Sequence, residues 1–276
     1  MLIDTHAHVN FAAYKDDADK VIRRALEKNI WLVNVGSQYS TSARAVRYAE
    51  KYPEGVLAAI GLHPVQLKKG GFLHHDSEEL EESEIKTIGE EFEYAKYLEL
   101  AKHPKVVAIG EVGLDYHHFE EGDDVEELKV KQKKIFLEFI QLANEVKKPL
   151  MIHCWDGYDD LLEILINNPV EKKGVIHSFV GGYKTAKKFI ELGYRIGLNG
   201  VVTYGISYDR LMKEIDLKDI VLETDCPYLT PVPLKGERNE PIYVELVAQK
   251  IAEVKNISVA AVVETTTHNA RSLFTI

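Results

Sequence analysis

Short apolar runs alternate with amphipathic segments along the whole chain, and this alternation predicts the fold. Eight of the runs are rich in Val, Ile and Leu with few polar interruptions. Near-continuous apolar strands separated by helices predict parallel pairing with both faces of the sheet covered. Eight such units, in a chain a little longer than the roughly 250 residues typical of the fold, predict a (β/α)8 TIM barrel. The expected strands are Met1–Val9, Trp31–Gly36, Val56–Leu62, Val106–Val112, Pro149–His153, Val175–Phe179, Tyr194–Leu198 and Ile220–Thr224.

The segments between these runs repeat apolar residues at spacings of three and four, as amphipathic helices do. Proline fits the first turn of a helix, so Pro241 is expected to open one. The helices that the pattern predicts most clearly are Asp17–Lys28, Val125–Val146, Thr185–Leu192, Ile242–Val254 and Val259–Phe274.

One segment interrupts the alternation of apolar runs and amphipathic segments. Lys68–Glu93 is long and acidic and contains Gly70-Gly71 and His74-His75. Loops longer than about 12–15 residues are often functional, which makes a lid over the barrel mouth one interpretation. We favour a solvated helix-loop insertion with His74 and His75 exposed. The whole chain, 1–276, is then expected to form a single barrel domain that carries this acidic insertion at about 68–93.

Five of the strand-like segments end in residues that can bind a metal ion. His6 and His8 are two residues apart, so on a strand they point to the same side and can share one cation. The active sites of such barrels lie at the carboxyl ends of the strands, where all of these residues fall. The expected ligands are His6, His8, Glu111, His153, His177 and Asp225.

These ligands divide into two groups. One ion would be held by His6, His8 and Asp225 and a second by His153 and His177, with Glu111 placed to bridge them. Two cations about 3.5–4 Å apart can activate a water and stabilise both oxygens of a displacement reaction. Asp225, a carboxylate at the metal, is the best candidate to take the proton from that water. The donor set suits Zn or Mn and also accepts Mg, so the identity of the ions stays open.

Composition narrows the function classes further. The net charge of −10 argues against a broad basic surface for duplex nucleic acid, so any such contact must be local. No stretch of about 18 apolar residues and no signal segment are present, from which we expect a cytoplasmic protein without membrane contact. Cys154 and Cys226 give no disulfide framework and are expected to be buried. No obligate protein partner is indicated.

Eight segments spread over nearly the whole chain together resemble the TatD family of metal-dependent hydrolases. His-x-His alone would indicate only the wider amidohydrolase superfamily, whereas the full set is specific. The segments are Ile3–Asn10 (IDTHAHVN), Ala59–Pro64 (AIGLHP), Gly110–Tyr116 (GEVGLDY), Ile152–Cys154 (IHC), Ile176–Phe179 (IHSF), Leu222–Pro231 (LETDCPYLTP), Arg238–Pro241 (RNEP) and Asn269–Phe274 (NARSLF).

The resemblance implies a (β/α)8 barrel that acts as a deoxyribonuclease or related phosphodiesterase, often from the 3′ end of DNA. It assigns the six ligands above to metal binding, and it places His63 near the scissile phosphate, as a hydrogen-bond donor. Arg238 either grips a phosphate or pairs with a nearby glutamate. Asp115 and Tyr116 are expected to orient Glu111 or to line the mouth. Asn269 is expected to tie down the last helix.

Two departures from the family pattern weaken the nuclease interpretation more than the hydrolase one. Trp155 stands where many members have arginine, and His177-Ser178-Phe179-Val180-Gly181 stands where many have His-Cys-Phe-Ser-Gly. Trp155 shares strand parity with His153, so it either stacks a terminal base at the mouth or packs beneath the following helix.

The leading hypothesis is a two-metal phosphodiesterase acting on single-stranded or frayed DNA ends. The alternative is a carbon ester or amide hydrolase, such as a lactonase, cyclic amidase or aminoacyl-tRNA deacylase, working through the same activated water. A zinc deaminase typically needs one metal only, so the fourth-strand ligand counts against it. A non-catalytic scaffold has no use for an open ligand cluster at a barrel mouth.

Overall fold

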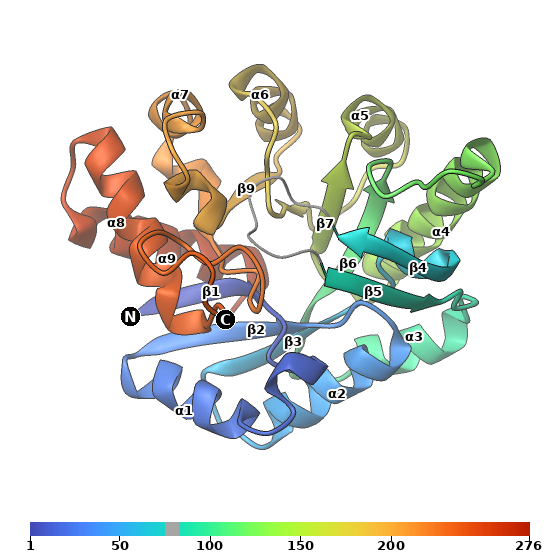
Figure 1. Cartoon of the computed structure of the whole chain (residues 1–276), viewed down its shortest axis with the longest axis horizontal. Helices are drawn as coiled ribbons and strands as arrows, with labels where there is room; N and C mark the ends of the chain where they lie inside the picture. The colour runs from blue at the N-terminus through green and yellow to red at the C-terminus, as the bar shows by residue number, and fades with distance from the viewer. Residues whose placement is uncertain (75–82) are drawn as a thin grey trace.

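Eight parallel strands alternate with helices and form a nearly closed barrel in the computed structural model, which describes residues 1–74 and 83–276 (Figure 1). The strands are hydrogen-bonded in the order β1-β2-β3-β6-β7-β8-β9-β10. Their bounds are β1 Leu2–Ala7, β2 Ile30–Val35, β3 Val56–Ile60, β6 Val106–Asp115, β7 Leu150–Trp155, β8 Gly174–Ile176, β9 Arg195–Leu198 and β10 Ile220–Leu222. All eight overlap the strands expected from the sequence, although β8 ends at Ile176, three residues before the expected end, and β6 continues to Asp115, and the TIM-barrel prediction is confirmed.

The chain just beyond β10 closes the barrel against β1. Ala7 and Cys226 form a parallel bridge. On either side of it, the amide of Asp225 donates to the carbonyl of His6 at 2.9 Å, and the amide of His8 donates to the carbonyl of Cys226 at 2.8 Å. The first and the last strand-end ligands are therefore held together by backbone hydrogen bonds.

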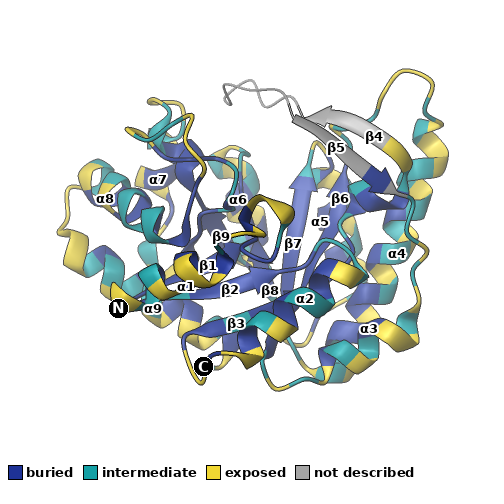
Figure 2. Ribbon diagram, turned by 60° about the horizontal axis from the view of Figure 1, so that its bottom comes forward, coloured by how far each residue is buried: buried dark blue, intermediate teal, exposed yellow. Residues whose placement is uncertain are grey.

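Helices cover the outside of the barrel, each with its apolar stripe turned inward (Figure 2). In α1 the buried residues Ala18, Val21, Ile22 and Ala25 follow the spacing of three and four that predicted the helix. The helices are α1 Ala18–Glu27, α2 Tyr39–Glu50, α3 Tyr94–Ala101, α4 Val125–Val146, α5 Tyr158–Asn167, α6 Tyr183–Glu191, α7 Asp209–Glu214, α8 Val244–Lys255 and α9 Val259–Phe274. None of the helices within the described residues is long and apolar enough to cross a membrane.

Capping explains where two of the helices begin. The Asp124 side chain accepts from the amide of Glu127 at 3.0 Å at the start of α4, and Ser258 caps α9 in the same way. Pro241 opens a short 3-10 turn, Pro241–Tyr243, and α8 starts at Val244, two residues later than predicted.

The interior of the barrel explains why the ligands lie where they do. Its lower layers are apolar and include Met151, Val175 and Val221, and α9 closes the bottom with Phe274. Side chains on a strand alternate between faces, so the inward row that begins at Met151 continues to His153, and the row from Val175 continues to His177. His153 and His177 therefore lie directly above a packed apolar layer.

The expected helix-loop insertion is wrong for the part of it that the structure describes. The segment contains two antiparallel strands, β4 Lys69–His74 and β5 Ser83–Ile88 (Figure 1). The pairing of β5 with β4 is a contact between two segments, which the pattern within either one does not reveal. His74 ends β4, and His75 lies outside the described residues. The function of this hairpin as a lid stays a prediction.

Candidate metal centre

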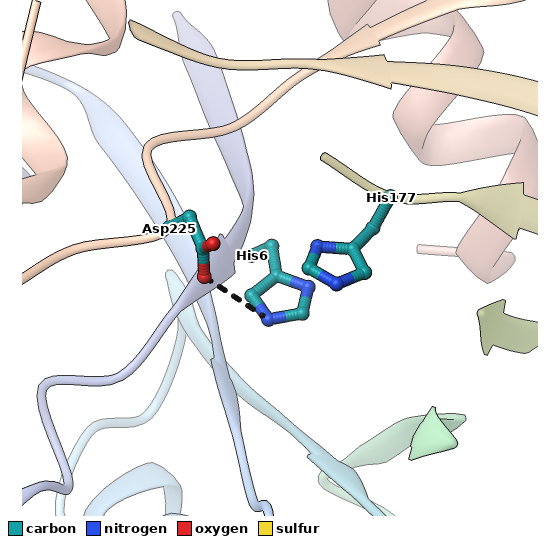
Figure 3. A group of neighbouring side chains, drawn as sticks. All are labelled: His6, His177 and Asp225. Atoms are coloured by element: carbon teal, nitrogen blue, oxygen red, sulfur yellow. Dashed lines mark ion pairs between the residues drawn. The ribbon is translucent and has the colours of Figure 1, made fainter. Parts of the chain in front are cut away.

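The six expected ligands converge at the carboxyl ends of their strands. Figure 3 shows the imidazole of His6 between Asp225, which follows β10, and His177, which follows β8. The rings of His6 and His177 stack with centroids 3.9 Å apart. Three overlapping groups place one donor atom per residue within 4.8 Å of the others: His6, His177 and Asp225; His6, His8 and Glu111; and His63, Glu111 and His153.

Glu111 is the central residue of the cluster, and its two carboxylate oxygens face different partners. Oε2 lies 3.5 Å from Nε2 of His6 and 3.6 Å from Nε2 of His8. Oε1 lies 2.7 Å from Nε2 of His177 and 3.1 Å from Nδ1 of His153. The two oxygens of this buried carboxylate thus face different pairs of histidines, although the rings of His6 and His177, one from each pair, stack on each other.

On the first side, His6 and His8 present their Nε2 atoms to each other at 3.1 Å. Oδ1 of Asp225 lies 3.2 Å from Nε2 of His8 and 3.6 Å from Nε2 of His6. The Nδ1 atom of His8 lies 2.9 Å from the carbonyl of Val35, which can only accept, so Nδ1 carries the proton and Nε2 is left as a donor of electrons. That tautomer is the one a metal ligand needs.

On the second side, two further carboxylates support the histidines. Oδ2 of Asp115 lies 2.9 Å from Nε2 of His153, and Oε1 of Glu223 lies 3.7 Å from Nδ1 of His177. The expectation that Asp115 orients Glu111 or lines the mouth is corrected: Asp115 is 1% exposed and holds His153. Glu223 was missed, although it shares strand parity with Asp225 and directly precedes Thr224 in the same run.

The electrostatics of the cluster favour ionised carboxylates. Burial raises the pKa of the Glu111 carboxyl, but attraction to His63 and His177 and hydrogen bonds from the histidines outweigh burial and hold that pKa well below its usual value. Burial likewise raises the pKa of Asp225, and its contacts with His8 and His6 lower it further than burial raises it. Burial lowers the pKa of His177, but its contact with Glu111 outweighs burial and raises that pKa well above its usual value. The centre therefore holds ionised carboxylates against basic imidazoles.

This donor set fits a metal. Four imidazoles and two ionised carboxylates meet in one small volume, and contacts such as that between Nε2 of His6 and Nε2 of His8 at 3.1 Å bring possible metal-ligand atoms together. Neither Lys nor Arg lines this pocket among the residues that the structure describes. A divalent ion would satisfy the facing donors, and histidine with carboxylate is a ligand chemistry of zinc and manganese.

The cluster opens into a pocket of about 120 Å³, whose other walls are largely apolar and aromatic. His63 and Trp155 both line it. His63 receives the amide of Val65 on Nδ1 at 3.2 Å, so in its neutral form it carries its proton on Nε2, which lies 3.2 Å from Glu111. Burial lowers the pKa of His63 to about 4. His63 is thus a neutral hydrogen-bond donor at the mouth.

Trp155 ends β7 and faces the pocket beside His153, as strand parity predicts. Its indole stacks on His118, with ring centroids 5.2 Å apart and planes 13° from parallel. His118 also lines the pocket and was missed; its Nδ1 lies 2.8 Å from Asp115, so one carboxylate joins His118 to His153.

Arg238 is not among the residues that line the pocket. Its guanidinium forms a two-pronged pair with Asp17 at 3.0 and 2.6 Å and lies 4.5 Å from the ring centroid of Tyr14. The expected glutamate partner is also present, because Glu240 lies 3.6 Å away. A phosphate contact by Arg238 would compete with these partners.

Asn269 donates to the carbonyls of Leu217 and Ile220 at 2.8 and 2.7 Å and so ties α9 to the start of β10. Cys154 and Cys226 are free and buried.

Comparisons with known proteins match nearly the whole chain to one family. A family model described as TatD related DNase matches residues 3–275. The chain is 38% identical over its full length to YabD of Bacillus subtilis, an uncharacterized metal-dependent hydrolase, and covers all of that protein. It is 30% identical to YcfH of Escherichia coli, also an uncharacterized metal-dependent hydrolase, over 100% of this chain and 96% of that one.

A solved structure extends the comparison to the fold. The crystal structure of YjjV, a TatD homologue from Escherichia coli, superposes with a TM-score of 0.82 at 26% identity and covers 100% of this chain and 98% of that one. The matches in sequence and in structure both run from end to end. The chain therefore belongs to the TatD family of metal-dependent hydrolases.

Proposed function

We propose that the chain is a two-metal phosphodiesterase that removes nucleotides from DNA ends in the manner of a 3′ exonuclease. The observation that carries the proposal is Glu111, whose two oxygens face two different pairs of histidines. A single bridging carboxylate with ligands on both sides is the arrangement that a pair of ions requires. The matching family model, described as TatD related DNase, supports a nucleic-acid substrate.

In this proposal His6, His8 and Asp225 would hold one ion, His153 and His177 would hold the second, and Glu111 would be shared between them. Bound divalent ions would lower the pKa of the attacking water and act as Lewis acids toward the phosphoryl oxygens. Side chains of the protein supply the proton acceptor and a hydrogen-bond donor to the phosphate. The carboxylate of Asp225, ionised and 15% exposed, takes the proton from the water. His63, protonated on Nε2, donates a hydrogen bond to a non-bridging oxygen of the phosphate.

A glutamate, Glu111, as the residue shared between the ions favours a phosphodiester substrate over a carbon ester or amide. Glu111 occupies the central position, and no lysine that could be carboxylated lines the pocket within the described part of the chain. A specific observation supports the second candidate, a carbon ester or amide hydrolase. Trp155 stands in the place of the arginine found in many family members, and no side-chain cation of the described residues lines the pocket to attract a charged phosphate.

A substrate panel separates the two candidates. Metal-loaded protein would be assayed on 3′-labelled single-stranded DNA, a chromogenic phosphodiester, and a set of lactones and cyclic amides, after metal analysis of the purified protein. Asp225→Asn should lose the activity, whereas Asp216→Asn, an exposed aspartate outside the site, should keep it. Turnover of lactones or amides with none of the phosphodiesters would replace the proposal by the second candidate.

A further inference from the structure

A second pocket opens at the same end of the barrel as the metal centre, and we call it the basic pocket. Its walls are residues 180–184, which lead from β8 into α6, and Ser207, Tyr208, Arg210 and Leu211 at the start of α7, and its volume is about 440 Å³. Asp209 does not line the pocket; its carboxylate lies 3.9 Å from Nζ of Lys250. Figure 1 shows α6 and α7 as neighbours in the outer ring. Both segments are connections that follow the carboxyl ends of strands, where barrels bind their ligands.

The basic pocket lies close to the metal centre along the chain. Ser178 lines the metal-centre pocket, and Val180 lines the basic pocket. Two residues of extended chain span at most about 7 Å. A ligand longer than one nucleotide can therefore reach both pockets.

The charges of the two pockets differ. Lys184 and Arg210 line the basic pocket, and no carboxylate is among the described residues that line it. Lys184 forms no ion pair with any residue of the described ranges 1–74 and 83–276. Arg210 pairs with Glu214 at 3.9 Å, but the two side chains are 76% and 47% exposed, so solvent screens that pair. The basic pocket thus has a positive charge that the metal-centre pocket lacks.

The start of α6 adds backbone donors to the same place. Gly182 is the N-cap of this nine-residue helix and no side chain caps it. The first N–H groups of a helix have no partner within the helix and favour anions. Tyr183 and Tyr208 line the pocket as well and offer aromatic faces beside these donors.

We propose that the basic pocket binds a backbone phosphate of the polynucleotide strand, next to the phosphodiester held at the metal centre. This inference rests on the proposed phosphodiesterase function and names the substrate as an oligonucleotide rather than a mononucleotide-sized ester. Lys184 and Arg210 supply charge-assisted hydrogen bonds to the phosphate oxygens. A chain with a net charge of −10 needs such a local cationic site to hold a polyanion.

The test compares the double variant Lys184→Gln/Arg210→Gln with a matched control, Lys187→Gln/Lys213→Gln. The control removes two cations from the same helices, α6 and α7, three residues further along, and neither residue lines the pocket. The ratio of kcat/KM for a single-stranded oligonucleotide to kcat/KM for bis(4-nitrophenyl) phosphate is expected to fall about tenfold in the pocket variant, as when one charged hydrogen bond is removed. The control should keep the ratio of the wild type.

Salt dependence gives a second readout. The slope of log affinity against log salt is expected to decrease by about 0.7, because the single strand then places one phosphate fewer against a cation of the protein. Equal ratios and equal slopes in the pocket variant and the control would overturn the proposal. So would a variant that is no longer inhibited by inorganic phosphate but keeps its affinity for oligonucleotides, because the pocket would then be a site for free anions.

A binding assay keeps this inference separate from the proposed function. Fluorescence anisotropy of labelled single-stranded DNA would be measured on Asp225→Asn protein, with and without the pocket substitutions. If the wild type cleaves no phosphodiester, the proposed function fails, and weaker binding in the pocket variant alone would still support the basic pocket. Unchanged binding in the pocket variant would overturn it whatever the wild type cleaves.

Discussion

Replacing Asp115 by asparagine should weaken metal binding without dismantling the barrel. The Asp115 carboxylate is buried and accepts from four donors. Oδ1 accepts from the amides of His117 and His118 at 3.1 and 2.9 Å, and Oδ2 faces Nε2 of His153 at 2.9 Å and Nδ1 of His118 at 2.8 Å. An asparagine can keep its oxygen on the two amides, but its NH2 group then meets the two imidazole nitrogens.

The expected loss of metal affinity follows from the anionic hydrogen-bond partner that the imidazoles of His118 and His153 lose. Burial raises the pKa of the Asp115 carboxyl, but hydrogen bonds from His118 and His153 outweigh burial and hold it well below its usual value, so the native partner is an anion. The neutral amide no longer orients His153 with its Nδ1 toward Glu111. Removal of such a supporting carboxylate typically costs about 10–100-fold in metal affinity, which is about 1.4–2.8 kcal/mol.

The assay is a titration of apoprotein with Zn²⁺ or Mn²⁺ against a chelating indicator, together with the melting temperature of the metal-free protein. Asp156→Asn is the matched control, because Asp156 also accepts from a histidine, His117 at 3.0 Å, but its side chain is 69% exposed. We expect weaker binding at one of two sites for Asp115→Asn and no change for Asp156→Asn. Wild-type affinity in the Asp115 variant would refute the role assigned to this carboxylate.

Three further outcomes follow from the site. Asp225→Asn, or exhaustive chelation of the wild type, should abolish turnover while the far-UV circular dichroism stays unchanged, and an active Asp225→Asn protein would contradict the assignment of the proton acceptor. Single-stranded or frayed DNA should be digested faster than blunt duplex at matched salt, because a net charge of −10 gives little sequence-independent attraction to a duplex; faster digestion of the duplex would argue against this account. Trp155→Ala should raise KM for oligonucleotides more than for a small base-free phosphodiester, since stacking contributes about 1–3 kcal/mol per base. Equal losses of activity on the two substrates, together with a lower melting temperature, would assign the indole to packing.

The arrangement of the ligands could be predicted from the sequence because it depends on local rules. Strand parity places His6 with His8, and a residue at the end of a parallel strand lies at the barrel mouth whatever the rest of the chain does. The same holds for α4, whose observed bounds, Val125–Val146, are those that the apolar spacing indicated.

The partners of those ligands could not be predicted, because they depend on contacts between distant segments. Asp115 reaches His153 because β6 and β7 pair with a shift of register between Ile109 and Val112, which no pattern within either strand reveals. Arg238 is bound by Asp17, a residue 221 positions away in the sequence. The β4–β5 hairpin also depends on pairing between two segments, which the pattern within either segment does not reveal.

The central claim is that one chain holds two metal ions on either side of Glu111. Anomalous diffraction from a crystal grown with Mn²⁺ or Zn²⁺ tests it most directly. The account predicts two anomalous peaks about 3.5–4 Å apart, one bounded by His6, His8 and Asp225 and the other by His153 and His177, with Glu111 touching both. A single peak at full occupancy under saturating metal, or a pair of peaks that Glu111 does not join, would contradict it.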